Sequence, residues 1–367
     1  MRAPARILGL VLLAAACDHG SAFQPSPPPP APPFSSLFPR RLTFNLGDDR
    51  TPAWLPDGSG IIYSTEREDQ PDHDRCLAIL PRDGGTIESR YCRFSIHADS
   101  NDLMEAPAVS SHGRIFFHQV VSSTGQPKLG LSALLLGPAE DPLLATPIRT
   151  LPYTAPNGRF HSSIRLPQWI GPDSLVYLAE QLFYEGSTTF PDTFYTGLDA
   201  VLLDFSAPAP VFNIIPGTDY ASSVAASDEP GVIYYTLGGD SRVLRQVLAS
   251  GEVGVVHDFG GGTIVRDAQV RGTTLVAVVG RSVLYRFEEN HGYVQRDEGG
   301  DLAFVELDSG ETAFFSTDSV LFRHPMISPD GSRVVVEVQP YAPVHAEPNS
   351  EFNATNHRAE LWLFDLD

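Results

Sequence analysis

Side chains that can bind a polar ligand occur in small groups along this sequence, and most groups combine a carboxylate with an arginine or a histidine. Carboxylates and imidazoles ligate divalent metals, and guanidinium groups hold polar ligands through charge-assisted hydrogen bonds. The candidate binding residues are Asp49, Arg50, Asp102, Glu105, His161, Asp219, Tyr220, Arg266, Asp267, Arg323 and His324. The groups are far apart in sequence, so they form one site only if the fold gathers them. Otherwise each side chain caps its own loop in water.

A repeated pattern supplies elements that would gather them. Residues 52–63 and 325–336 nearly match, and each contains Pro-Asp-Gly between apolar runs. Proline presets φ for a turn, aspartate accepts backbone hydrogen bonds, and glycine allows a positive φ. Each copy therefore predicts a strand, a tight turn and a second strand.

Four weaker copies lie between these two, so equivalent positions fall near residues 54, 108, 169, 225, 269 and 326. This spacing is typical of four-stranded propeller blades. We therefore expect an all-β protein, a six-bladed β-propeller of four-stranded antiparallel blades that begin near residues 50, 104, 164, 220, 265 and 322. Residues 41–44 would add an N-terminal strand to the last blade and close the ring.

The repeats resemble the Pro-Asp-Gly, WD40-like propeller repeats of TolB-like periplasmic proteins. The resemblance covers residues 41–367, and Leu361-Trp362-Leu363-Phe364-Asp365 is similar to the third strand of such a blade. It implies the fold and a bacterial envelope setting, but a propeller hosts many functions. No separate N-terminal α/β domain is visible.

Propeller geometry sorts these features by face. All Pro-Asp-Gly turns lie on one face, where Asp57, Asp173 and Asp330 are expected to brace their own turns, while Trp54 and Trp169 pack between blades. The candidate binding residues lie at the entries to the first strands, on the opposite face. Three long loops, 67–74, 180–194 and 341–357, belong to that second face, where binding is most common.

The N-terminus predicts export. Arg2 and Arg6 precede an apolar run that ends at Cys17, which is typical of a signal peptide with a lipobox-like end over residues 1–17. Lipidation of Cys17 is expected, and ordinary secretion is the alternative. Residues 18–40 are proline-rich and predict an extended tether. We expect a lipid-anchored protein of the bacterial cell envelope, facing the periplasm or the cell surface, with the lipid as its one membrane contact.

The two remaining cysteines predict a disulfide. Cys76 and Cys92 flank a turn and are expected on neighbouring strands of the first blade. An oxidising envelope favours their pairing, and two reduced buried thiols are the alternative.

Charge and motifs narrow the function. The formal net charge of −20 disfavours nucleic acid as a partner and suits a cationic partner or a divalent metal. No nucleophile elbow, His-Glu-x-x-His or Walker motif occurs. We expect a non-enzymatic binding module for an envelope protein or peptide. No cofactor is expected unless calcium or another divalent metal binds the acidic loop at residues 66–74 or the channel. The alternative is a metal-assisted polysaccharide lyase or hydrolase that uses His161 and His324.

Overall fold

The computed structural model describes most of the predicted propeller. The described residues are 34, 37–44, 47–66, 74–93, 100–123, 130–156, 158–185, 192–207, 209–280, 283–286, 293–296, 299–317, 320–340 and 359–366. Within them the chain forms 27 strands and one 3-10 helix, Pro142–Leu144. No helix in these ranges is long and apolar enough to cross a membrane.

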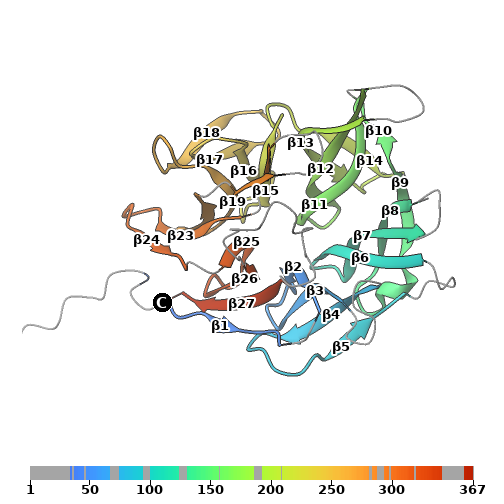
Figure 1. The fold of residues 1–367 in the computed structure, drawn as a ribbon, viewed down its shortest axis with the longest axis horizontal. Coiled ribbons are helices and arrows are strands. Elements are labelled where there is room, and N and C mark those ends of the chain that lie inside the picture. The colour runs from blue at the N-terminus through green and yellow to red at the C-terminus, as the bar shows by residue number, and fades with distance from the viewer. Residues whose placement is uncertain are drawn as a thin grey trace, which may run out of the picture.

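The strands form antiparallel sheets arranged around a central axis, which is the architecture of a β-propeller (Figure 1). Two of the sheets have four strands each, and neighbouring strands in each sheet follow one another in the order of the sequence. They are β15 (Ala221–Ala226), β16 (Val232–Leu237), β17 (Arg242–Val247) and β18 (Val253–Asp258), and then β19 (Val265–Arg271), β20 (Thr274–Val279), β23 (Asp301–Glu306) and β24 (Thr312–Phe315).

Two further sheets also stand alone. One has five strands: β10 (Tyr153–Thr154), β11 (Phe160–Gly171), β12 (Ser174–Glu185), β13 (Asp192–Asp204) and β14 (Val211–Ile214). The other joins the chain ends and contains β25 (Val320–Ile327), β26 (Arg333–Pro340), β27 (Glu360–Asp365) and β1 (Arg40–Arg41). A small hairpin, β21 (Val283–Arg286) with β22 (Tyr293–Arg296), is inserted between β20 and β23.

The remaining strands form one eight-stranded sheet rather than two separate blades. Its strands are β2 (Asp49–Trp54), β3 (Gly60–Glu66), β4 (Arg75–Pro81), β5 (Ser89–Tyr91), β6 (Ser100–Val109), β7 (Arg114–Ser123), β8 (Gly130–Pro138) and β9 (Thr146–Leu151). The structure thus shows a propeller of four-stranded antiparallel blades, with four sheets separate and the first two predicted blades hydrogen-bonded together. The link is a single parallel pairing, Arg75 with Leu103.

Each copy of the repeat forms an antiparallel pair of strands, and its first strand is the innermost one. The six pairs are β2–β3, β6–β7, β11–β12, β15–β16, β19–β20 and β25–β26. We call the face where the inner strands begin the entry face, and the face where each inner strand turns back the turn face. Residues just before or early in an inner strand therefore lie towards the entry face.

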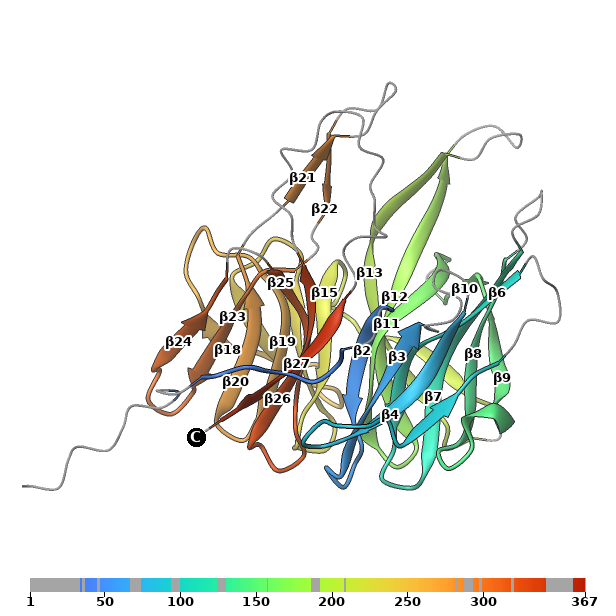
Figure 2. The same ribbon diagram turned by 60° about the horizontal axis from the view of Figure 1, so that its bottom comes forward.

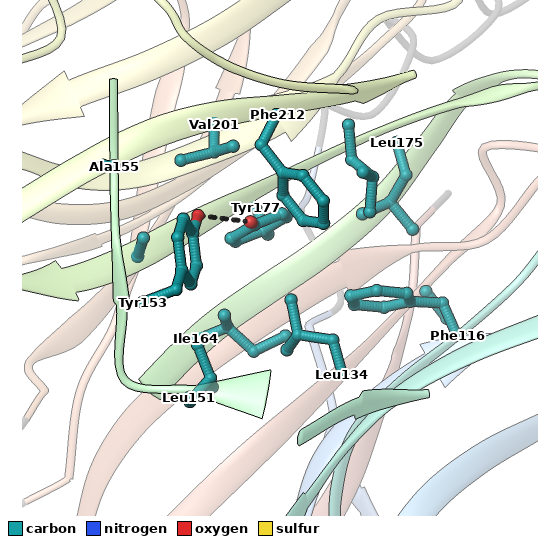
Figure 3. Packing of buried hydrophobic residues seen from close by; sticks show 13 residues of the cluster. Phe116, Leu134, Leu151, Tyr153, Ala155, Ile164, Leu175, Tyr177, Val201 and Phe212 are labelled. Carbon is teal, nitrogen blue, oxygen red and sulfur yellow. Dashed lines mark hydrogen bonds between the residues drawn. The ribbon is translucent and has the colours of Figure 1, made fainter. Parts of the chain in front are cut away.

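Apolar side chains fill the space between neighbouring sheets. Among the described residues they form six buried clusters, and one of them packs β11–β13 against β7 and β8 through side chains such as Phe116, Leu134 and Tyr177 (Figure 3). Every cluster contains buried Val, Leu or Ile side chains, and most also contain a buried aromatic one; each such side chain contributes about 1.5–3 kcal/mol on burial. The stability of the propeller therefore resides mainly in the contacts between sheets.

The N-terminal segment is part of this packing. β1 pairs antiparallel with β27, with Arg40 opposite Leu363, and Leu42 is only 4% exposed. Phe34 is buried against Phe304, so the packed body begins earlier than the predicted tether boundary at residue 40. Residues 1–33, including Cys17, lie outside the described residues.

The turns differ in detail from the prediction. Asp57 accepts from the backbone N–H and hydroxyl of Ser59, and Asp330 does the same for Ser332, so both brace their own turns. Asp173 instead accepts from the Arg114 guanidinium at 2.8 Å, which ties its turn to the preceding inner hairpin. An Arg–Asp pair across two hairpins competes well with a local turn bond because the charge strengthens it.

The tryptophans and the cysteines follow the prediction. Trp54 Nε1 donates to the carbonyl of Met326 at 2.8 Å, and Trp169 Nε1 donates to the carbonyl of Ala108, each on a neighbouring inner strand. Cys76 and Cys92 form a disulfide, in register with the β4–β5 pairing.

One predicted loop is mostly strand. Residues 180–194 were expected as a loop, yet β12 and β13 stay paired out to Glu185 opposite Asp192. Both strands of this extension contain a Phe-Tyr pair, and aromatic residues favour strands. Of the other two long loops, 67–74 and 341–357, residues 67–73 and all of 341–357 lie outside the described residues.

Candidate functional site

The inner strands share a distortion that shapes the centre of the propeller. Thr51, Ala106, Leu166 and His324 have left-handed φ values of 48°, 50°, 52° and 47°, and each precedes a proline. A shift in strand register accompanies each of them. Such bulges interrupt the ladder and release the local N–H for another acceptor.

Three of the released N–H groups donate to side chains of the preceding predicted blade. Thr51 N donates to Glu337 Oε2 at 3.0 Å, and Ala106 N donates to Thr51 Oγ1 at 3.2 Å. The backbone N–H of His324 donates to the carboxylate of Asp267. We call the set Asp267, His324, Glu337, Thr51 and Ala106 the polar belt, because it runs from β19 through β25 and β26 to β2 and β6.

Glu337 is the charged centre of the polar belt. Its side chain is 1% exposed, and it accepts from His324 Nδ1 at 3.1 Å as well as from Thr51. Burial alone would raise its pKa, but the charge and hydrogen bond of His324, with Arg323 and Arg50, hold the pKa of Glu337 well below its usual value. Glu337 therefore remains an anion that fastens two neighbouring sheets.

The environment of Asp267 raises its pKa, whereas that of Glu337 lowers its pKa. Asp267 is 5% exposed, and burial raises its pKa to about 7, although His324 and two backbone hydrogen bonds act against the shift. The nearby Glu337 carboxylate adds to the rise. Asp267 is thus a buried carboxyl group that gains or loses its proton near neutral pH.

A second polar cluster joins β2, β3, β4 and β6. Arg75 pairs with Glu105, and it also lies 3.4 Å from both Asp48 and Glu66. Arg50 contacts Asp48 at 2.5 Å. Two of the predicted residues, Arg50 and Glu105, are thus joined through Asp48 and Arg75.

His161 lies at the start of β11, towards the entry face as expected, but its side chain is not open to the channel. It is fully buried, with Nε2 3.0 Å from Asp199 Oδ2 and Nδ1 3.0 Å from the hydroxyl of Tyr153. Tyr153 OH in turn lies 3.1 Å from Tyr177 OH within an apolar cluster (Figure 3). The cause is the strand phase: position 161 faces the neighbouring sheet. Since His324 contacts Glu337 elsewhere, the expected histidine pair is not assembled.

The remaining candidates occupy separate positions. Asp219 pairs with Arg159 at 3.0 Å, and Asp102 accepts from the amide of Gln119. Arg266 donates to the carbonyl of Gly280, and Asp49 is buried. Tyr220 is 61% exposed and has a left-handed φ of 64°. The set is therefore divided between buried networks and an exposed rim at the entry face.

The residues that sequence reasoning missed carry a recognisable signal. Glu337 interrupts Val334-Val335-Val336 and Val338, and Asp199 stands between Leu198 and Ala200. A carboxylate inside a buried strand is costly unless it is paired. An acidic residue within an apolar strand could thus have been selected without the structure.

The chemistry of this centre is hydrogen bonding and ion pairing. Within the described ranges, no three His, Cys, Asp or Glu side chains are grouped so as to hold a metal ion. The polar belt offers carboxylates and an imidazole, and the rim offers Tyr220 and the Arg159–Asp219 pair. Such an arrangement can recognise polar groups of a ligand or partner.

Comparison with known proteins identifies the architecture. No protein-family model matches this chain, and no curated protein sequence matches it. A gluconolactonase from Xanthomonas campestris superimposes with a TM-score of 0.52 and 12% identity over 91% of this chain and 90% of that one.

Two other solved structures are similar at a lower score. A regucalcin, described as a calcium-binding protein, from Agrobacterium tumefaciens gives a TM-score of 0.49 at 15% identity, covering 90% of this chain and 95% of that chain. TolB from Acinetobacter baumannii gives 0.46 at 13% identity, covering 85% and 64%. At such identities the likeness concerns the fold alone.

Proposed function

We propose that this protein is a six-bladed propeller closed by its N-terminal segment, and that it acts as a non-enzymatic binding module anchored in the cell envelope. The blade count is supported by the weak link inside the eight-stranded sheet, where one parallel pairing joins two four-stranded halves. It is also supported by six apolar clusters among the described residues, one for each junction of a six-blade ring.

Closure and anchoring belong to the same proposal. One cluster packs Trp54 and Tyr63 against Leu361 and Leu363, so the first and last strand groups meet. β1 then adds the outer strand beside β27. Residues 18–33 would lead from this strand to a lipid on Cys17, with secretion as the alternative.

The main observation in support of the binding role is that two hairpins and an exposed tyrosine lie on the entry face. The β12–β13 and β21–β22 hairpins both extend from this face beyond the ring (Figure 2). Tyr220 is exposed at the same face, held by a left-handed backbone that is unfavourable for a tyrosine. Raised hairpins around an exposed aromatic residue are typical of a surface that contacts a protein or peptide.

Charge favours a cationic partner. The chain carries a net charge of −20, and the partly buried Arg50 and Arg75 are already paired with carboxylates. A basic envelope protein or peptide would be drawn to such a surface, and its association would weaken at high salt.

A pull-down with matched variants tests the binding role. Tyr220→Asn removes the exposed entry-face aromatic residue, and asparagine tolerates the left-handed φ. Phe314→Asn on β24 is the control, because Phe314 has similar exposure, 63% against 61%, on an outer strand. Crosslinked native envelope should yield the same partner with wild type and Phe314→Asn, and at least several-fold less with Tyr220→Asn. Equal capture by all three proteins, or no capture by wild type, would refute the proposal.

A further inference from the structure

β19 presents a polar face towards the last inner strand. Asp267 and Gln269 are two residues apart and so share one face of the strand, while Ala268 and Val270 face an apolar cluster on the other side. The polar face meets β25, because the carboxylate of Asp267 accepts the N–H of His324. Asp267 is 5% exposed and Gln269 is 6% exposed.

Each of these two side chains has one buried atom without a hydrogen-bond partner among the described residues. The atoms are Asp267 Oδ1, an acceptor, and Gln269 Nε2, a donor. Leaving such a group unpaired in the interior is costly, because it has lost its hydrogen bonds to water without gaining others. Two of them on one strand face indicate that a group from outside the protein completes their hydrogen bonds.

Asp267 and Gln269 both belong to an inner strand of the propeller. β19 is one of the inner strands around the centre, with β11 and β25 on different sides of it (Figure 1). The side chain of Gln168 on β11 reaches Met326 on β25, with 3.7 Å between Nε2 and Sδ. Side chains from inner strands on different sides of the centre therefore meet there. Asp267 precedes Gln269 on β19 and lies nearer the entry face.

We propose that Asp267 and Gln269 bind a carboxamide group that enters from the entry face. The N–H of the amide would donate to Asp267 Oδ1, and its carbonyl would accept from Gln269 Nε2. One amide supplies both complementary groups on neighbouring atoms. The low exposure of both side chains admits only a small group, such as the end of an asparagine or glutamine side chain. The inference rests on the proposed function, because a peptide partner would provide that side chain.

Acetamide is the probe for this site, and N,N-dimethylacetamide is its control because it accepts but cannot donate. The measurement is the shift of the Gln269 side-chain amide signals in ¹⁵N NMR, assigned by their loss in Gln269→Glu. At pH 8 most Asp267 is ionised, given its pKa of about 7. We expect a saturable shift with acetamide and none with N,N-dimethylacetamide.

One protein variant tests whether the Asp267 acceptor is needed, and a second serves as its control. In Asp267→Asn the side-chain oxygen should still accept from the His324 N–H, so the NH₂ group takes the place of Oδ1. The acceptor for the ligand is then lost, and acetamide should no longer shift the Gln269 signals. Asp57→Asn, on the turn face, should bind as wild type does. If Asp267→Asn does not fold, Gln269→Glu provides the same test, with backbone signals near Ala268 as the readout.

The outcomes separate this inference from the binding role. No acetamide shift in wild type, as expected if only an ordered water fills the site, overturns the inference. An equal shift by both probes or in Asp267→Asn also overturns it. Neither result affects the capture of a partner that depends on Tyr220. If acetamide binds but no partner is captured, the carboxamide site is supported and the binding role is refuted.

Discussion

At the scale of single residues, the centre of this protein depends on two carboxylates with opposite environments. Glu337 accepts hydrogen bonds from His324 and Thr51, and its pKa is held low. Asp267 has a raised pKa, and one of its oxygens has no partner in the described part of the chain. The first residue holds sheets together, and the second remains available to a ligand.

Replacing Glu337 should destabilise the fold strongly. Glu337→Gln leaves His324 and Arg323 beside a neutral group in a buried position, which should cost about 3–5 kcal/mol. Because the folded pKa lies below the unfolded one, the contribution of Glu337 is present above about pH 4.5 and is lost as the pH falls. Urea unfolding at pH 7 and pH 3 measures both effects.

An exposed pair serves as the control for that experiment. Glu229 contacts Arg245 at 2.5 Å but is 60% exposed, so Glu229→Gln should change stability by less than about 1 kcal/mol. Similar losses for the two variants at pH 7 would contradict the role assigned to Glu337.

Replacing Asp267 should change the pH dependence of stability in the opposite sense. Its folded pKa, about 7, exceeds the unfolded value, 3.8, so its contribution is complete below about pH 4 and is lost as the pH rises towards 7. Asp267→Asn removes this loss. Relative to wild type, the variant should gain about 2–3 kcal/mol between pH 5 and pH 8, at about 1.4 kcal/mol per unit.

The groups that face Asp267 must be followed in the same titration. They are His324 on β25 and Glu337 on β26. If the free energies of unfolding of wild type and Asp267→Asn differ by the same amount at every pH from 5 to 8, Asp267 does not titrate in this range.

At the scale of elements, the inner strands were the most predictable part of the fold. The x-Pro pattern and the Pro-Asp-Gly turns located them, because proline and glycine act on the backbone directly. The left-handed residue before each proline was not predicted, since residues before proline usually favour extended backbone. That bulge, seen at Thr51 and His324, builds the polar belt. Sequence reasoning therefore found the strands but not the contacts between them.

The site was only partly predictable for a similar reason. Arg323 and His324 were selected from their place before a first strand, and the structure brings them to Glu337. His161 was selected by the same rule but faces the neighbouring sheet. The rule gives the position along a strand, whereas the face depends on register, which the weaker repeats do not specify.

The disulfide stabilises a single element, β5, against β4. Cys76 and Cys92 are 16 residues apart in sequence, and a loop of that length should contribute about 3 kcal/mol. Cys76→Ser with Cys92→Ser should lose this amount in denaturant unfolding. Reductant should lower the stability of wild type by a similar amount and leave the double variant unchanged, and an effect on both proteins would point to another cause.

At the scale of the whole molecule, the stability of a propeller depends on joining its first and last strand groups. The chain ends meet through hydrogen bonds and apolar packing: Leu42 N donates to the carbonyl of Leu361, and Thr43 Oγ1 accepts from Leu361 N. Asp48 accepts from Ala359 N at 2.7 Å. A ring that opened here would expose the edge of β27, which favours aggregation.

Removing the N-terminal segment tests whether it closes the ring. Deleting residues 1–46 removes buried Phe34 and Leu42, which should cost about 3–6 kcal/mol and lower the melting temperature by about 10 °C. Deleting residues 1–33 alone keeps Phe34, β1 and Leu42, so this control should melt as wild type does if those residues close the ring. Light scattering should detect association of the longer deletion through the uncovered β27 edge. If both deletions melt together and remain monomeric, β1 is a surface addition and the ring is closed by the Trp54–Leu361 packing alone.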